Sequence, residues 1–225
     1  MDKLKNWIVI LLTAILPFLI YISNRLINDN TIFSYIILLF ASIFVTWFCY
    51  FILSEFLYRF HFIRKLFDPL ARFEGRWICT IEVENSEDLR VCGFYNFKFN
   101  TYEKCYMHSG ENYDDNGNAI TSFIMSNVYY SKQIHGFHFY GAVIRIANNK
   151  LEIINCWGEV RFTETKRKLN SAHGYFVNNS GATIIRAKTS IERIPKKDLK
   201  ENDFEHQYQR AEYALQYWKE RNNKI

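Results

Sequence analysis

FEGRWICTIEVE, residues 73–84, is the stretch in which the sequence changes its period. The chain before it is mostly apolar and compatible with helix. From residue 74 onward apolar and polar residues alternate, which is the pattern of a strand with one buried face. Gly75 stands two residues before Trp77 and leaves room for that large ring to turn inward. The stretch therefore predicts the start of a β-rich domain.

Further segments after this one show the same alternation, and turn signals rich in Asn, Gly, Ser and Asp separate them. We expect eight strands, over residues 74–84, 90–100, 102–109, 119–130, 134–147, 150–162, 172–178 and 182–194. Because no helical segment intervenes, they predict an antiparallel up-and-down meander in an all-β domain. Closing it into a barrel of about eight strands removes the exposed edges of an open sheet. A Gly-x-Trp at the first strand is also seen in lipocalin-like barrels, which supports this architecture but indicates no ligand.

The last segment, residues 203–222, predicts a C-terminal helix capped by Asn202 or Asp203. Its apolar residues recur at spacings of four and three and form one stripe, which consists of Phe204, Tyr208, Ala211, Leu215 and Trp218. We expect this stripe to pack on its own domain, which would span residues 74–225. Self-association through the stripe is the alternative.

Residues 6–24 and 30–54 contain no formal charge. A hydrocarbon core of about 30 Å needs about 20 helical residues, so both segments predict transmembrane helices within a unit over residues 1–54. Basic residues flank the two segments on the outer sides, namely Lys3, Lys5, Arg59, Arg64, Lys65 and Arg72. This distribution predicts a multi-pass protein of a bacterial inner membrane with both termini cytoplasmic.

Small and polar residues follow one face of the second segment at Ser42, Thr46 and Cys49. Such a stripe suits contact with another membrane helix, although small residues are common in membrane helices in any case. Residues 55–73 mix basic and aromatic residues and predict an amphipathic connector. Its helical part should end near Asp68, because the residue before Pro69 is pushed away from helical geometry.

The charge balance and the motifs exclude several classes of function. The chain has 28 Lys and Arg against 23 Asp and Glu, too mild an excess to predict a duplex nucleic acid as partner. The five cysteines form no C-x-x-C, and His135 and His138 fall on opposite faces of a strand, so we expect neither a metal site nor a cofactor. No catalytic motif is present, neither G-x-S-x-G nor H-E-x-x-H nor a Walker loop. We therefore predict a binding protein without catalytic residues.

Odd-numbered residues of the predicted strands carry many aromatic side chains and two arginines, Arg145 and Arg161. If this face points into the barrel, the guanidinium groups need a partner, because an unpaired buried charge is costly. A phosphate held by the two arginines, beside a base stacked on Trp157 or Tyr95, would supply one. The alternative is an ordinary aromatic core with both arginines outside or paired to Glu159.

The order of the parts resembles one bacterial family. Two N-terminal apolar segments, the second running through YRFHFIRKLFDPL (residues 58–70), lead into a strand-rich domain opened by FEGRWICTIEVE. This layout is similar to the two-transmembrane, β-strand-rich effectors of CBASS antiphage systems, which are encoded beside a nucleotidyltransferase that makes cyclic nucleotides. The resemblance implies a cytoplasmic β-barrel that binds a cyclic dinucleotide, self-associates on binding, and lets its helices disrupt the lipid bilayer.

Two other classes of function stay open from the sequence. One is a membrane-anchored barrel that binds a lipid or other apolar ligand, which an apolar interior with both arginines outside would favour. The other is a structural or assembly protein, which the lack of any pocket would favour.

Overall fold

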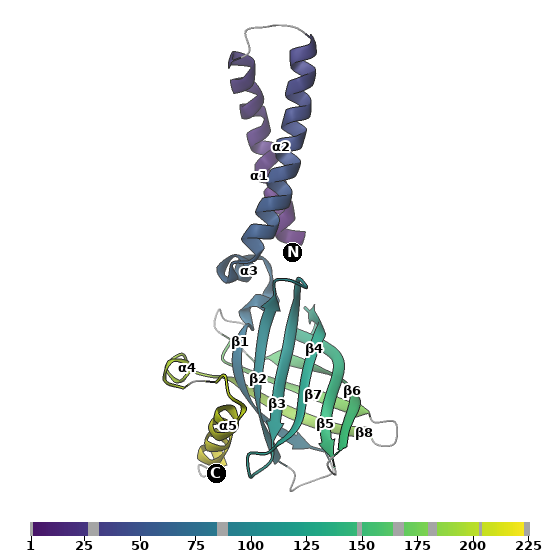
Figure 1. The fold of residues 1–225 in the computed structure, drawn as a ribbon, viewed down its shortest axis with the longest axis vertical. Helices are drawn as coiled ribbons and strands as arrows, with labels where there is room; N and C mark the ends of the chain where they lie inside the picture. The colour runs from purple at the N-terminus through teal and green to yellow at the C-terminus, as the bar shows by residue number, and fades with distance from the viewer. Residues whose placement is uncertain are drawn as a thin grey trace. The chain divides into compact units, whose positions relative to one another are not determined.

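The computed structural model of the chain describes residues 2–26, 32–84, 90–147, 150–163, 169–179, 184–202 and 204–222. The chain forms two compact units, Met1–Pro69 and Leu70–Ile225. The first is helical, and the second is a β-barrel with helices at its C-terminal end (Figure 1).

The helical unit contains α1 (Asp2–Leu26), α2 (Ile32–Tyr58) and α3 (His61–Phe67). Helices α1 and α2 pack against each other. The second helix runs four residues beyond the predicted end at residue 54, through Tyr58, and so takes in the first part of the predicted connector.

Arg64 fixes the corner between α2 and α3. Its Nη1 donates hydrogen bonds to the carbonyl oxygens of Tyr58, at 2.8 Å, and Arg59, at 2.7 Å. The Tyr58 hydroxyl in turn donates to Oδ2 of Asp68 at 2.5 Å. Asp68 is extended and ends α3, as expected for the residue that precedes Pro69.

The predicted membrane location is wrong. Across the part of the chain that the structure describes, no helix is long and apolar enough to cross a membrane. A span needs about 20 consecutive, predominantly apolar helical residues. Freedom from formal charge is a weaker criterion, because uncharged polar residues add to the length of a segment without making it apolar. The inference of a multi-pass inner-membrane protein with both termini cytoplasmic is corrected accordingly.

The predicted antiparallel β-barrel with a C-terminal helix is confirmed. The strands are β1 (Gly75–Val83), β2 (Arg90–Asn100), β3 (Cys105–Tyr113), β4 (Ala119–Ser131), β5 (Gly136–Ala147), β6 (Lys150–Phe162), β7 (Ser171–Asn179) and β8 (Ile184–Arg193). Each strand pairs antiparallel with the next, and β1 pairs with β8, which closes the barrel in the order β1 to β8.

The register decides which residues face the inside. Odd-numbered residues point inward on β1, β2, β5 and β8, whereas even-numbered residues point inward on β3, β6 and β7, as burial shows. On β5 and β6, for example, Val143 lies opposite Ile154 and both are buried. Strand β4 changes face at the bulge between Ile124 and Asn127.

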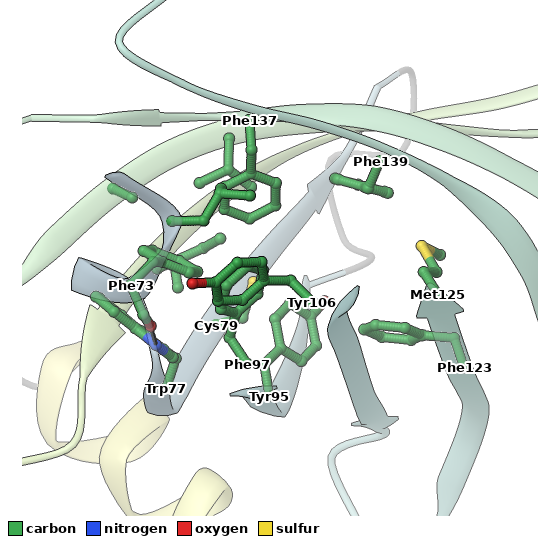
Figure 2. Packing of buried hydrophobic residues seen from close by; sticks show 14 of the residues in the cluster. Phe73, Trp77, Cys79, Tyr95, Phe97, Tyr106, Phe123, Met125, Phe137 and Phe139 are labelled. Atoms are coloured by element: carbon green, nitrogen blue, oxygen red, sulfur yellow. Dashed lines mark hydrogen bonds between the residues drawn. The ribbon is translucent and has the colours of Figure 1, made fainter. Parts of the chain in front are cut away.

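One end of the barrel is closed by a cluster of rings. Phe73 follows the short 3-10 helix η1 (Pro69–Arg72) and stacks on Trp77 with ring centroids 4.0 Å apart. The indole Nε1 of Trp77 donates to the carbonyl oxygen of Phe73 at 2.9 Å. Phe97 and Phe137 pack edge-on against Phe73 (Figure 2). We call this the closed end.

Gly75 makes this closure possible, as the Gly-x-Trp led us to expect. It has a φ of +143°, and a Cβ there would lie 2.6 Å from Nη1 of Arg193. Arg193 covers the Trp77 ring at 4.2 Å and donates to the carbonyl oxygens of Leu169, Glu74 and Arg72 at 2.8, 2.7 and 2.7 Å. A side chain at position 75 would therefore displace the group that seals this end.

The C-terminal segment packs on the outside of the barrel. Helix α4 spans Asp198–Glu201 and helix α5 spans Gln207–Asn222, later than the predicted start at residue 203. A second apolar cluster joins α5 to β1, β2 and β3, and consists of Ile78, Cys92, Phe94, Tyr113, Ile194, Phe204, Ala211 and Ala214. Of the predicted stripe, Phe204 and Ala211 are buried, whereas Tyr208 is 66% exposed.

Candidate functional site

The barrel contains an inner cavity of about 30 Å³. Its apolar lining comes from Phe123, Met125, Phe139, Val143, Cys156, Val160, Phe176 and Ile191. Its polar lining comes from Tyr95, His108, Asn112, Asn178 and Thr189. The hollow is therefore an aromatic chamber with a few placed hydrogen-bonding groups, which is the usual composition of a small-molecule site.

Two of these polar residues, Tyr95 and Asn112, form a chain of hydrogen bonds along the wall with Thr121 of β4. The Tyr95 hydroxyl donates to Oδ1 of Asn112 at 3.0 Å, and Nδ2 of Asn112 donates to Oγ1 of Thr121 at 2.6 Å. These bonds fix the orientation of the Asn112 amide. Burial is the main cause that raises the pKa of Tyr95 well above its usual value, so its hydroxyl keeps its proton as a donor.

Two other polar atoms of the lining are buried without a hydrogen-bond partner among the described residues, Nδ1 of His108 and Oδ1 of Asn178. The His108 ring is 3% exposed and has the rings of Tyr95, Phe123 and Phe139 edge-on at 5.2, 5.1 and 5.4 Å. Burial lowers the pKa of His108 from 6.5 to about 3, so the imidazole is neutral at pH 7. Buried polar atoms in native proteins are nearly always paired, and these two mark the place where a ligand or water completes the lining.

Arg145 lies on the inner face near the other end of the barrel. We call this end the mouth: β1, β3, β5 and β7 finish there, and the closed end is opposite. Arg145 shares its face with Phe139 and Val143 and pairs in register with Thr121 on β4 and Glu152 on β6. It is half-buried, and no described residue forms a hydrogen bond or ion pair with its guanidinium.

The four predicted ligand-binding residues are split between the two sides of the wall. Tyr95 and Arg145 face inward. Trp157 is 46% exposed on the outer face, where its ring meets Tyr175 edge-on at 5.9 Å. Arg161 is also outside, and its Nε donates to Oε1 of Glu159 at 2.6 Å. The expectation that all four share one face is wrong, because β6 turns its even-numbered residues inward.

The residues that the sequence reasoning missed are His108, Asn112 and Asn178. They occupy even positions of β3 and β7, whereas the sequence hypothesis rests on odd-numbered residues of other strands. The signal was available in the turn between β2 and β3, since Asn100 pairs with Cys105 and an odd residue therefore faces an even one.

The predicted helix contact lies inside the helical unit. Thr46 lines a groove between α1 and α2 together with Val9, Leu12, Thr13, Ile43, Trp47 and Tyr50. Ser42 is half-buried one turn earlier, and the side chain of Cys49 lies outside the described residues. Thr46 thus faces the neighbouring helix of its own chain.

The comparisons with known proteins leave the function open. No family model matches the chain, and no curated protein matches its sequence. Among solved structures, the chain is similar to the S-type phycobiliprotein lyase CPES from Guillardia theta, with a TM-score of 0.35 and 11% identity, over 60% of this chain and 98% of that chain. A likeness this weak carries no information about what the chain binds.

Proposed function

We propose that the protein is a ligand-binding effector whose barrel takes a cyclic dinucleotide through its mouth, as the resemblance to CBASS effectors implies. One observation carries the proposal: two polar atoms in the inner cavity, on His108 and Asn178, have no hydrogen-bond partner among the described residues, and Arg145 stands on the same inner face near the mouth. These groups match the two chemical parts of a nucleotide, a base and a phosphate.

The base is the part that suits the cavity. Its flat ring packs against aromatic side chains such as Phe123 and Phe139, and such contacts contribute about 1–3 kcal/mol per base. The neutral His108 accepts a hydrogen bond at Nδ1 when its other ring nitrogen carries the proton. Oδ1 of Asn178 is a second acceptor. A base that presents N–H groups on its edge satisfies both atoms.

The phosphate is the part that suits Arg145. A guanidinium presents its N–H groups in a planar fork and binds phosphate oxygens in pairs. Because Arg145 lies nearer the mouth than the cavity lining does, it meets a phosphodiester that stays at the entrance while the base enters.

The size of the cavity sets a condition on binding. A volume of about 30 Å³ is enough for one or two water molecules, whereas sites for drug-sized ligands measure about 300–1,000 Å³. The ligand therefore binds a more open arrangement of rings such as Phe123 and Phe176, and it stabilises that arrangement by binding it more tightly. The same preference can drive self-association if the open form is the one that assembles.

Titration calorimetry of the full chain with a panel of cyclic di- and trinucleotides tests the proposal. We expect one cyclic dinucleotide to bind, and Arg145→Ala to weaken binding by about 1.5–3 kcal/mol, the range for a charged hydrogen bond. Arg161→Ala is the matched control, because that arginine is outside and paired to Glu159. Equal affinities for the wild type and Arg145→Ala would remove Arg145 from the site, and no binding by any member of the panel would reject the function.

A small apolar ligand is the second candidate, and the lining favours it. Most residues around the cavity are apolar, and one of the two arginines, Arg161, is outside. Such a ligand would bind in the same chamber without a phosphate. Its affinity would fall with Phe139→Ala and stay the same with Arg145→Ala, the reverse of the strong arginine dependence expected for a nucleotide.

A further inference from the structure

A second hollow lies on the outer wall of the barrel, between β1 to β4 and the C-terminal segment. It is a groove of about 250 Å³, several times larger than the inner cavity. Polar side chains form a row across its floor: Arg76 on β1 lies opposite Asn96 on β2, and Asn96 lies opposite Ser109 on β3. We call it the Arg76 groove.

The positive charge of the groove rests on Arg76. The other arginine in the lining, Arg210, is neutralised by Glu111, because its Nε and Nη2 contact the two carboxylate oxygens at 3.0–3.1 Å. Arg210 also donates to the carbonyl oxygens of Phe204 and Glu205. Its N–H groups are therefore largely used within the protein.

Arg76 is different, because no carboxylate among the described residues forms an ion pair with it. Its guanidinium lies over the ring of Phe204, 5.4 Å from the centroid. This cation–π contact uses none of the guanidinium N–H groups as hydrogen-bond donors, so they stay available to a ligand. The Asn96 amide stands beside it and provides further donors, whereas the Ser109 hydroxyl donates to the carbonyl oxygen of Asn96 at 3.4 Å.

We propose that the Arg76 groove binds a small phosphorylated molecule, with its phosphate on Arg76 and Asn96. A cation with neutral donors around it is the arrangement that suits a phosphate monoester. The volume leaves room for a small organic group next to the phosphate. The proposal concerns a different face of the wall from the inner cavity and does not depend on the cyclic dinucleotide.

Calorimetry of the full chain with ribose 5-phosphate, inorganic phosphate and ribose tests it. Ribose 5-phosphate should bind, more tightly than inorganic phosphate, and ribose should not. Arg76→Ala should lower the affinity by at least about tenfold, the loss of one charged hydrogen bond. Arg76→Lys should recover part of it, because it restores the charge without the planar fork. Arg186→Ala, at an exposed arginine of β8, and Arg145→Ala should leave it unchanged.

Asn96→Ala leaves the contact between Arg76 and Phe204 in place and should lower the affinity for ribose 5-phosphate by about threefold or more, the loss of one neutral hydrogen bond. This second variant keeps the test decisive if Arg76→Ala fails to fold. Ribose 5-phosphate that binds no better than ribose overturns the proposal. So does an affinity that neither Arg76→Ala nor Asn96→Ala changes. Inorganic phosphate binding as tightly as ribose 5-phosphate also overturns it, since the organic group would then contribute nothing.

Discussion

Among the described residues, two arginines face the interior of the barrel, Arg193 at the closed end and Arg145 near the mouth. Arg193 donates to three carbonyl oxygens and covers the ring of Trp77. Burial lowers its pKa to about 10, but the guanidinium still carries its charge at pH 7. Arg145 has no such set of partners among the described residues.

The two ends therefore use the same side chain for different purposes. At the closed end Arg193 uses its N–H groups on carbonyl oxygens of the protein and holds the fold together, although Nε2 of His135, which is buried at the same end, has no hydrogen-bond partner among the described residues. Arg145 near the mouth, and Nδ1 of His108 and Oδ1 of Asn178 in the cavity lining, have no hydrogen-bond partner among the described residues. A buried polar group that the fold does not need, and does not pair, is better explained by a ligand than by stability.

The largest expected effect is on the closed end. Trp77 is 1% exposed and stacks on Phe73, so Trp77→Ala should lower the free energy of unfolding by about 3–5 kcal/mol, the usual cost of removing a buried aromatic side chain. Urea denaturation followed by circular dichroism measures it. A loss below about 1 kcal/mol would mean that this end is not the sealed part of the core.

Arg193→Met should have the next largest effect, about 3 kcal/mol, because it leaves the carbonyl oxygens of Leu169, Glu74 and Arg72 without their donor. The same denaturation experiment applies. The free energy of unfolding should fall without any loss of ligand affinity in the molecules that remain folded. Loss of affinity at unchanged stability would break the distinction between the two ends.

The pH dependence of stability should show the cost of burying His108. Its pKa is lowered from 6.5 to about 3 in the folded chain, so the unfolded chain binds the proton more readily. The stability that depends on a neutral His108 is therefore fully present above pH 6.5 and is lost as the pH falls from 6.5 toward 3. We expect the free energy of unfolding to be about 2 kcal/mol lower at pH 5 than at pH 8 because of His108 alone.

His108→Leu isolates the contribution of His108 to this pH dependence, since it keeps an apolar side chain in the cavity lining and removes the titrating group. The variant should lose this part of the pH dependence and should also lose ligand affinity. Parallel pH curves for the wild type and His108→Leu would show that His108 titrates normally and is not buried as described.

The smallest effect on stability belongs to Arg145→Met. Because its guanidinium has no described partner, the free energy of unfolding should change by less than about 0.5 kcal/mol. The matched pair Arg145→Met and Arg193→Met, measured side by side in urea, gives the comparison directly. Equal losses for the two variants would show that Arg145 also serves the fold.

The sequence predicts the barrel well because alternation is a local property. Each strand is predicted by the alternation of its own residues, and Gly75 with Trp77 indicates the start of the first strand. The site is harder to predict because it depends on how strands pair. In the β5–β6 hairpin Ala147 pairs with Lys150, so an odd residue faces an even one and Trp157 and Arg161 fall outside. Register, and not residue type, separates Arg145 from Arg161.

In the helical unit the secondary structure was predictable from the sequence, but the location inferred from it was not. Helices form close to the predicted segments, but the property inferred from their lack of charge, a membrane span, is not found among the described residues. Helix formation depends on neighbouring residues, whereas a span depends on a long uninterrupted apolar stretch, and the first does not imply the second.

The pairing of β1 with β8 limits how copies of this protein can meet. A sheet with a free edge can recruit another chain by hydrogen bonds from its backbone, and such contacts spread with little regard to sequence. Here the backbone groups of both terminal strands are used on each other. Copies of the barrel would therefore have to contact one another through side chains, because no strand edge between β1 and β8 is left to extend the sheet into a second chain.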